Sequence, residues 1–510
     1  MSHAIGVDLG TTNAKVALVR DDGSLVASAT RTIATSRAGE VAEQDAHEIW
    51  DAVTSAIREV TAADAGAAAD VVTLAVCSQY SSIVPVDDSS IPVAPMALWQ
   101  DRRGTDHSWD ILGADEGNFM LWVERHGIPP VGNGLSLAHI MHFEHDRPEV
   151  RSATATYLEP MDYVNARLTG RRCATQVTML TSQLCDNRTL GVTSYDPDLV
   201  ARSGVDPSRL PELIGLADTV GTLLPEVAGE LGLRAEVTVQ AGLSDTIADV
   251  VATGALASGR AGLAIGTTSV LVDRADAHAV DLDHEVLAMP SPFGTHLVWA
   301  ENGIGGRAIE FVLDGLFHTA DGLGDHRIDD PFARLDDVLA SVPAGANGVM
   351  FLPWLNGSLS PSADAAMRGG FLNLGLETTR TDLVRAAAEG VGHNLAWLLP
   401  HVERFTGHRI DDLAFVGGAA RSGAWCQILA DVLDRPVSPL VEPDRAIARA
   451  TGLFALARHG VLDDADLDAL VNLARTYEPD PVNQRALAGV TEQFVAAFEA
   501  LKPVYQALNP

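Results

Sequence analysis

Residues 5–19 read IGVDLGTTNAKVALV, in which two apolar runs flank an aspartate at position 8 and a Gly-Thr-Thr turn. Such a turn presents backbone N–H groups and hydroxyls without charge, which are the donors that cradle phosphate oxygens. Gly10 lacks the Cβ that would hold a phosphate away from the backbone. The same arrangement returns in residues 262–272, GLAIGTTSVLV. Two plain hairpin turns remain the alternative, but the repeat favours a duplicated fold with one phosphate-binding turn in each half.

The sequence around these turns alternates between strand and helix patterns. Residues 4–32 predict an antiparallel meander, residues 45–60 a helix with an acidic start, and residues 71–79 a buried strand. At 510 residues the chain is longer than one hydrophobic core supports. We therefore expect an α/β protein of two domains, residues 1–252 and 253–510, with a cleft between them.

The composition is acidic, because 68 Asp and Glu residues against 35 Lys and Arg residues give a net charge of −33. A field of that sign repels polyanions, so we expect no nucleic-acid partner and no membrane partner. The four cysteines form no Cys-x-x-Cys pair, which is typical of reduced thiols in a cytoplasmic protein. Asp8 and Lys15 interrupt the amino-terminal apolar run, so no signal peptide is predicted. The oligomeric state stays open, with a homodimer as one option.

Lysine is scarce, and its positions restrict how a nucleotide could be bound. The chain has two lysines, Lys15 beside the first turn and Lys502 near the carboxyl end. A Walker loop and the strand lysine of a protein kinase both require a lysine elsewhere in the chain. If this protein binds nucleotide phosphates, the Gly-Thr-Thr turns must therefore do so.

Six motifs occur in a fixed order: DLGTT (8–12), LWQDRR (98–103), GLSD (242–245), AIGTT (264–268), FLPWLNG (351–357) and VGGAARSGAWCQILAD (416–431). Together they resemble the FGGY family of carbohydrate kinases, which includes xylulokinase and glycerol kinase and belongs to the actin-like ATPase superfamily. The resemblance covers nearly the whole chain. It implies an α/β fold of two duplicated actin-like ATPase (ribonuclease H-like) domains with a central cleft. The sugar would bind on the 1–252 side and ATP on the 253–510 side, with Mg²⁺ as the second cofactor.

The resemblance also implies which residues carry the reaction. Asp245 would be the general base, and an ordinary carboxylate suffices because phosphoryl transfer is largely dissociative. Asp8 and Asp245 would hold the Mg²⁺. From the residues alone, the simpler interpretation of Asp245 is the N-cap of the helix that follows it. The residues implied for ATP are Gly10, Thr11, Thr12, Lys15, Gly266, Thr267, Gly306, Gly417, Gly418, Ala419 and Ser422.

The sugar pocket is implied to contain Gln79, Tyr80, Trp99 and Asp101 together with Asp245. The tryptophan would form an apolar wall, and its polar neighbours would hydrogen-bond the sugar hydroxyls. The motif LWQDRR is closest to the corresponding motif of glycerol kinases. Gln79, Tyr80 and the serine that follows match neither the Gln-Met-His of xylulokinases nor the Gln-Arg-Glu of glycerol kinases. Because such side chains decide which hydroxyls are recognised, the sequence leaves the substrate open.

Three further positions depart from the family pattern: His139 and His142 replace lysine and tryptophan, and Asn373 replaces glycine. None of them is a phosphate or base residue, so we expect activity to survive. His139, His142 and His145 also suggest a metal site as an alternative. At this spacing on a helix the third ring points away from the first two, which favours packing or surface roles.

Our leading hypothesis is ATP- and Mg²⁺-dependent phosphorylation of a hydroxyl of a small sugar or polyol, with a xylulokinase-like layout. A glycerol, tetritol or pentitol kinase of the same family is one alternative, and a regulatory actin-like ATPase without a sugar acceptor is another. An oxidoreductase is the third, because Gly303-x-Gly305-x-x-Ala308 approaches a dinucleotide-binding fingerprint. That class needs a second strand with an acidic end, and the residues that follow are polar and turn-rich.

Overall fold

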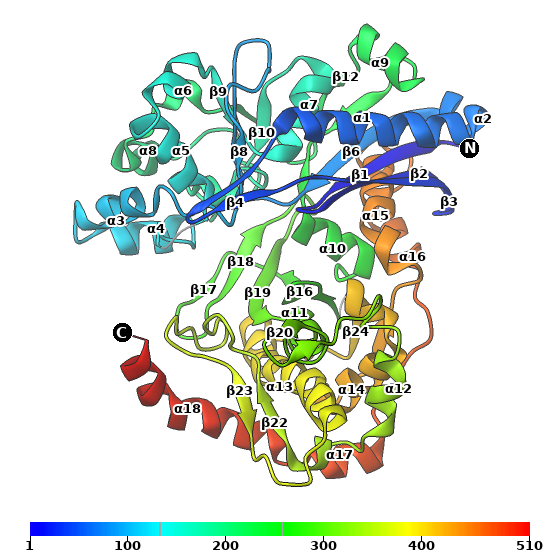
Figure 1. Ribbon diagram of the computed structural model, residues 1–510. Coiled ribbons are helices and arrows are strands. Elements are labelled where there is room, and N and C mark those ends of the chain that lie inside the picture. The colour runs from blue at the N-terminus through cyan, green and yellow to red at the C-terminus, as the bar shows by residue number, and fades with distance from the viewer. Residues whose placement is uncertain (132–133, 258, 510) are drawn as a thin grey trace.

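The computed structural model describes residues 1–131, 134–257 and 259–509. Within these residues the framework is two seven-stranded sheets, one from each half of the chain (Figure 1). The first sheet has the order β12-β13-β6-β1-β2-β3, with β14 paired to β6. The second has the order β17-β18-β19-β16-β15-β24-β25.

The strands of both sheets are short to medium in length. Those of the first sheet are β1 (His3–Leu9), β2 (Asn13–Arg20), β3 (Leu25–Thr32), β6 (Val71–Ser78), β12 (Thr219–Thr222), β13 (Thr238–Gln240) and β14 (Leu243–Ser244). Those of the second are β15 (Arg260–Ile265), β16 (Thr268–Ala275), β17 (Val280–Asp281), β18 (Val286–Pro290), β19 (His296–Ile304), β24 (Asp412–Val416) and β25 (Val437–Pro439).

The two sheets share one pairing pattern around the Gly-Thr-Thr turns. β1 pairs antiparallel with β2 and parallel with β6, while β15 pairs antiparallel with β16 and parallel with β24. The first turn joins β1 to β2, and the second joins β15 to β16. The duplicated α/β fold predicted from the repeated turn is therefore confirmed, and the meander of residues 4–32 is observed as β1–β3.

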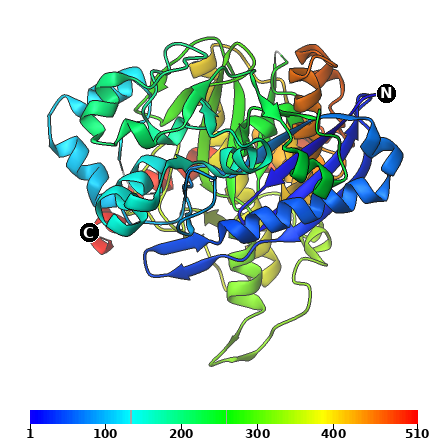
Figure 2. The same cartoon turned by 90° about the horizontal axis from the view of Figure 1, so that it is seen from above.

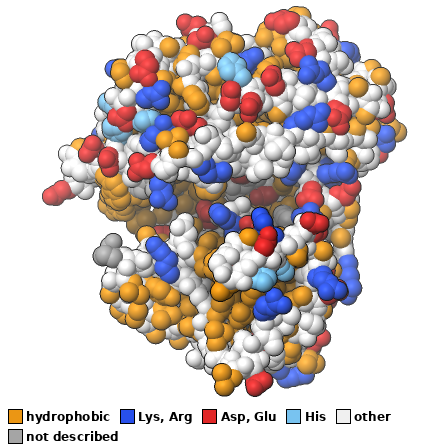
Figure 3. Space-filling view, viewed as in Figure 1, with side chains coloured by type: hydrophobic (Ala, Val, Ile, Leu, Met, Phe, Trp, Pro, Cys, Tyr) orange, Lys and Arg blue, Asp and Glu red, His pale blue; other side chains and the backbone are white. Residues whose placement is uncertain are grey.

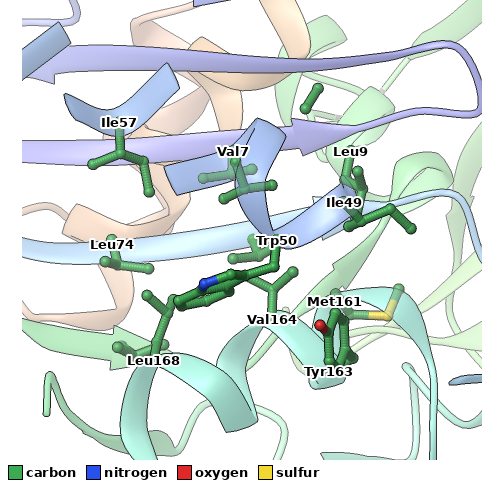
Figure 4. Close-up of a cluster of buried hydrophobic side chains, with 14 of the residues drawn as sticks. Val7, Leu9, Ile49, Trp50, Ile57, Leu74, Met161, Tyr163, Val164 and Leu168 are labelled. Carbon is green, nitrogen blue, oxygen red and sulfur yellow. The ribbon is translucent and has the colours of Figure 1, made fainter. Parts of the chain in front are cut away.

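Helices cover both faces of the first sheet. α1 (Ala46–Ala63) and α7 (Pro160–Thr169) lie on one face, and α15 (Pro443–Arg458) lies on the other (Figure 1). The carboxylate of Asp45 caps α1 by accepting a hydrogen bond of 2.8 Å from the N–H of His47. Figure 4 shows the core that results, with Trp50 of α1 and Val164 of α7 packed beside Leu74 of β6.

Each half of the chain contributes one helix that packs on the sheet of the other half. α10 (Asp245–Thr253) packs on β15, β16 and β24 of the second sheet, whereas α15, from the second half, packs on β1, β2 and β6. Gly6 of β1 lies so close to the backbone of Ala448 and Gly452 in α15 that a Cβ would overlap the helix. The two helices also pack on each other. The division into residues 1–252 and 253–510 stays a prediction, because each half contributes a helix to the other.

The remaining elements surround these layers. The other helices are α2 (Ala65–Ala69), α3 (Thr105–Gly113), α4 (Asn118–Arg125), α5 (Ser136–His145), α6 (Pro148–Ala153), α8 (Pro197–Ser203), α9 (Pro225–Leu231), α11 (Arg307–Glu310), α12 (Leu335–Ser341), α13 (Arg380–Thr406), α14 (Gly423–Leu433), α16 (Asp464–Ala469), α17 (Pro481–Leu487) and α18 (Val490–Leu508). The minor strands are β4 (Ser36–Ala38), β5 (Val41–Gln44), β7 (Val84–Val86), β8 (Met96–Ala97), β9 (Thr156–Leu158), β10 (Cys173–Thr175), β11 (Glu212–Ile214), β20 (Ala320–Asp321), β21 (Gly324–Asp325), β22 (Met350–Leu352) and β23 (Gly370–Leu372). Figure 2 shows the segment that carries β20 and β21 projecting from the body. Among the described residues, none of the helices combines the length and the apolarity needed to cross a bilayer.

Candidate active site

Three neighbouring strands of the first sheet end at the same edge. β1 and β14 both pair parallel with β6, and the last residues of all three strands are in register. The residues that follow these strands are Gly10, Gln79 and Asp245. The fold therefore brings together the first Gly-Thr-Thr turn, a residue expected to bind sugar and the expected general base.

Asp245 is the first residue of α10, but it is not the N-cap of this helix. The N-cap is Ser244, whose Oγ accepts a hydrogen bond of 3.4 Å from the N–H of Ile247. The N-cap interpretation of Asp245 is therefore wrong. Burial raises the pKa of Asp245 to about 7, hydrogen bonds from Thr246 oppose the rise, and the negative charge of Asp8 adds to it. A carboxyl group that titrates near neutrality is well matched to accepting a proton from an alcohol.

Asp8, Lys15 and Asp249 complete the charged group around Asp245. Asp8 lies opposite Lys15 in the β1–β2 ladder, and Lys15 Nζ is 3.6 Å from Asp8 Oδ2. Burial raises the pKa of Asp8, and the charge of Lys15 opposes that rise. Asp249 lies one helical turn after Asp245, and burial, followed by the charges of Asp245 and Asp8, raises its pKa well above the ordinary value. Asp249 was not predicted, although its i, i+4 spacing from Asp245 was the available signal.

Asp8 and Asp245 supply the hard oxygen donors that Mg²⁺ prefers. Across residues 1–131, 134–257 and 259–509, no group of three or more His, Cys, Asp or Glu side chains is placed to hold a metal ion. Two carboxylates fit an ion that takes its other ligands from nucleotide phosphates and water. His139, His142 and His145 of α5 do not form the metal site considered as an alternative, and His142 Nδ1 instead lies 2.8 Å from Asp146 Oδ2.

The hydroxyl of Thr11 connects the first turn to the expected sugar residues. It donates a hydrogen bond of 2.6 Å to Gln79 Oε1 and accepts one of 3.3 Å from Trp99 Nε1. Gln44 Nε2, at the end of β5, donates a bond of 2.6 Å to the carbonyl oxygen of Thr11. The neighbouring Thr12 is exposed. Gln44 was not predicted, because its short strand carries no motif.

Tyr80 extends the acceptor side of the site to the second half of the chain. Its ring centroid lies 5.8 Å from that of Trp299 on β19. Burial raises the pKa of Tyr80 well above the ordinary value, and the neighbouring side chain of Thr246 opposes the rise. The buried Oη of Tyr80 forms no hydrogen bond of standard geometry, which is unusual for a buried hydroxyl.

Asp101 differs from the other expected sugar residues, because its carboxylate is already satisfied. The side chain is 1% exposed and accepts bonds of 2.9 Å from the N–H of Ala42 and 3.0 Å from Arg103 Nε. These hydrogen bonds outweigh burial and lower the pKa of Asp101. The observed role is to anchor β5 and the LWQDRR loop, and a direct contact with sugar stays a prediction.

The second sheet carries a cavity of about 830 Å³ at the corresponding edge. β15 and β24 are parallel neighbours, so Gly266 and Gly417, which follow them, emerge side by side. The cavity gathers six of the residues expected to bind ATP: Gly266, Thr267, Gly306, Gly418, Ala419 and Ser422.

Close backbone contacts explain the glycines of this cavity. The N–H of Gly306 donates a bond of 2.8 Å to the carbonyl oxygen of Gly266, and a Cβ on Gly306 would lie 2.5 Å from that oxygen. Gly417 has a φ of +99°, and a Cβ there would overlap the carbonyl oxygen of Ile265. By contrast, a Cβ on Gly266 would meet no atom within 4 Å. Gly266 therefore keeps the cavity side of the turn open without being required by its neighbours.

Comparison with known proteins decides the family. The sequence pattern of the FGGY family of carbohydrate kinases matches this chain in both of the family's domains, the N-terminal domain over residues 3–252 and the C-terminal domain over residues 264–457. This chain belongs to the FGGY family of carbohydrate kinases. It is an ATP-dependent sugar kinase, and the family resemblance expected from the six motifs is confirmed.

Relatives of this FGGY kinase act on more than one kind of sugar. A xylulose kinase from Staphylococcus epidermidis is 24% identical over 508 residues, covering 98% of this chain and 96% of the relative. A gluconokinase from Bacillus subtilis is 23% identical over 497 residues, covering 95% and 93%. The structure of a ligand-bound xylulose kinase from Lactobacillus acidophilus superposes with a TM-score of 0.87 at 21% identity, covering 100% of both chains. The fold is therefore that of the family along the whole kinase.

The dinucleotide fingerprint is not part of an oxidoreductase fold in this FGGY kinase. Gly303 and Gly305 lie at the end of β19, which is antiparallel to both of its neighbours, whereas a dinucleotide-binding unit needs parallel strands. The segment instead delivers Gly306 to the cavity of the second sheet. The oxidoreductase alternative is therefore wrong.

The sequence analysis did not predict an acidic residue that lines the cavity of the second sheet. Ser422 caps α14 by accepting a bond of 3.1 Å from the N–H of Trp425, and its hydroxyl donates to Asp336 Oδ1. The other oxygen of Asp336 accepts a bond of 3.1 Å from the N–H of Gly423. Asp336 lines the cavity from α12, a region in which the sequence shows only a polar, acidic run.

Proposed function

We propose that this kinase transfers the γ-phosphoryl group of MgATP to a hydroxyl of an uncharged ketose or polyol, with Asp245 as the general base. The observation that carries the proposal is the common edge of β1, β6 and β14, at which Gly10, Gln79 and Asp245 emerge together. Phosphate donors, a hydroxyl-binding amide and a proton acceptor are thereby available within one site.

The charges of the site favour an uncharged acceptor. Asp8, Asp245 and Asp249 form one electrostatic group, and Glu301 of β19 also raises the pKa of Asp245. The basic side chain of this group, Lys15, is already beside Asp8. The carboxylate of a sugar acid would therefore meet several carboxyl groups and no unpaired cation, whereas neutral hydroxyls can hydrogen-bond to these carboxyl groups in either protonation state. The xylulose kinase relatives are thus a better guide to the substrate than the gluconokinases.

The residues of this chain then have separate tasks. The turns at Gly10 and Gly266 would hold the phosphates through backbone N–H groups, while Asp8 and Asp245 would hold Mg²⁺, which neutralises charge on the transferred group. Asp245 would accept the proton of the attacking hydroxyl as the new P–O bond forms and the bond to ADP breaks. Approach of the two halves would exclude water, which is itself a competing acceptor.

A coupled ADP-release assay tests the proposal. Reactions would contain MgATP with D-xylulose, xylitol, glycerol, D-gluconate or no acceptor. We expect a neutral ketose or polyol to raise ADP release at least about a hundredfold above the blank, which is the low end of what one positioned base contributes. D-Gluconate as the best acceptor would contradict the charge argument, and no stimulation by any compound would favour the ATPase without a sugar acceptor.

A further inference from the structure

A second cavity, of about 400 Å³, lies between the two halves of the molecule beside the acceptor residues. We call it the side crevice. The first half contributes Phe119 and residues 127–129, and the second contributes β17, β18 and β19 with Leu359. Figure 3 shows hydrophobic side chains gathered along the hollow between the halves. Its volume is within the range of about 300–1,000 Å³ that is usual for small-molecule sites.

The mouth of the side crevice exposes large apolar side chains. Phe119 is 38% exposed, Leu282 48% and Leu359 39%, although the three belong to different segments of the chain. Single exposed apolar residues are ordinary, but several around one concave site indicate a surface that something apolar covers.

Strand β19 connects the side crevice to the residues expected to bind the acceptor. Trp299 lines the crevice, and its ring also packs 5.8 Å from that of Tyr80. Glu301, two residues later on β19, lines the crevice as well, and its charge reaches Asp245 and Tyr80. The wall of the crevice formed by Trp299 and Glu301 is therefore next to Tyr80 and close enough to Asp245 to affect its charge.

The charges of the side crevice restrict what it can hold. Asp281, Glu285 and Glu301 are its ionisable residues, and its described lining includes no lysine, arginine or histidine. Burial raises the pKa of both Glu285 and Glu301. An anionic group has no partner there, whereas an uncharged chain can pack on Phe119, Leu282 and Trp299.

We propose that the side crevice receives the end of the acceptor that is remote from the reacting hydroxyl, and that the kinase phosphorylates ketoses or polyols bearing an uncharged alkyl substituent at that end. This inference rests on the proposed function. The competing explanation is that the two halves close the crevice on themselves and leave no room for a ligand.

The test compares D-xylulose with two series of its alkyl ethers, methyl to butyl, at O1 and at O5. Two series are needed because one of them blocks the reacting terminal hydroxyl. In the productive series we expect kcat/KM to rise about threefold for each added methylene, since each one leaves water for an apolar surface. Ligand-induced changes in Tm with ADP and Mg²⁺ present measure binding independently of turnover.

Variants of the crevice locate the effect. In Leu282→Gln and Phe119→Ser we expect the ratio of kcat/KM for the butyl ether to that for D-xylulose to fall towards 1. Leu376, which is fully exposed in another part of the second half, gives the matched control Leu376→Gln, and the ratio should not change there.

The outcomes separate the two proposals. If D-xylulose is phosphorylated but kcat/KM stays flat or falls with chain length in both series, the side crevice is not an acceptor subsite and this inference is overturned. An unchanged ratio in both crevice variants has the same meaning. If no sugar or polyol is phosphorylated at all, the proposed function itself fails.

Discussion

The hydroxyl of Thr11 donates a hydrogen bond of 2.6 Å to Oε1 of Gln79, which joins the turn after β1 to the loop after β6. Gln79 is 4% exposed, so its amide depends on such partners. The same hydroxyl accepts a bond from the indole of Trp99. A residue expected to bind phosphate therefore also orients the side chains expected to bind sugar, which couples the two substrates through one side chain.

The first prediction follows from this bond. In Thr11→Val, the Oε1 atom of Gln79 loses its donor, and an unsatisfied buried polar group costs about 1–3 kcal/mol. We expect the KM of the acceptor to rise about tenfold or more with a smaller change in kcat. Steady-state kinetics at saturating MgATP measure both constants, and Thr11→Ser, which keeps the hydroxyl, is the control. An unchanged acceptor KM in the valine variant would contradict this role.

The second prediction concerns Asp245. Asp245→Asn removes the proton acceptor but keeps the size of the side chain, so we expect kcat to fall by about 10²–10⁴. The affinity for ADP without Mg²⁺, measured calorimetrically, should change little, because the cavity expected to bind the nucleotide is lined by residues of the second half. Asp51→Asn, on the exposed side of α1, is the matched control and should leave kcat unchanged. Near-normal turnover by Asp245→Asn would show that Asp245 is not the general base.

The pH dependence gives a third prediction. Because the pKa of Asp245 is about 7, kcat/KM should fall tenfold per pH unit below that value as the base becomes protonated. Glu301 is one of the negative charges that raise the pKa of Asp245, so Glu301→Gln should lower that pKa and move this limb to lower pH. A limb that stays in place in Glu301→Gln would show that the charge of Glu301 does not act on Asp245.

Stability provides an independent measurement of the same shift. The folded pKa lies above the ordinary value of 3.8, so the folded state binds the proton more tightly than the unfolded state does. This contribution to stability is lost as pH rises through about 7. Asp245→Asn should therefore raise Tm at pH 8 relative to the unsubstituted protein, and the difference should shrink as the pH is lowered towards 4.

Two glycines that directly follow β15 and β24 give a fourth prediction. Gly417→Ala should unfold at a lower Tm, because a left-handed φ and an overlap with Ile265 together cost about 2 kcal/mol or more. Gly266→Ala should keep its Tm, since no atom lies within 4 Å of the added methyl group. That methyl group would instead face the cavity and weaken ADP binding about tenfold. Equal Tm values for the two variants would contradict the assignment.

Local patterns in the sequence predicted the framework of the fold. The two Gly-Thr-Thr turns, the meander at β1–β3 and the strand before Asp245 each depend on a few consecutive residues, so periodicity and turn chemistry suffice. Parallel pairing then brings Gly10, Gln79 and Asp245 to one edge.

The residues that the sequence did not predict reach the site through tertiary contacts. Trp299 meets Tyr80 only after two sheets have packed, and Asp336 reaches Ser422 from a helix 86 positions earlier in the chain. Asp101 belongs to a motif that resembles a sugar-binding motif. A local pattern could not show that its carboxylate already accepts hydrogen bonds from Arg103 and from the N–H of Ala42.

The last prediction concerns Glu159, a fully buried acid that holds the loop after β6. One oxygen accepts a bond of 3.1 Å from the N–H of Ser82, and the other accepts bonds from the hydroxyls of Ser136 and, over 3.2 Å, Thr181. Burial raises its pKa to about 8, so at neutral pH most of it is protonated despite these donors.

In Glu159→Ala, the N–H of Ser82 is left buried without a partner, and the loop that carries Gln79 and Tyr80 loses its anchor. We expect the acceptor KM to rise and Tm to fall, with a cost of about 1–3 kcal/mol for each donor left unpaired. Glu159→Gln keeps one carbonyl oxygen and should recover part of both effects, whereas Glu149→Ala, on the exposed side of α6, should change neither. If the alanine variant lowers Tm but leaves the acceptor KM unchanged, Glu159 supports the fold without positioning the sugar loop.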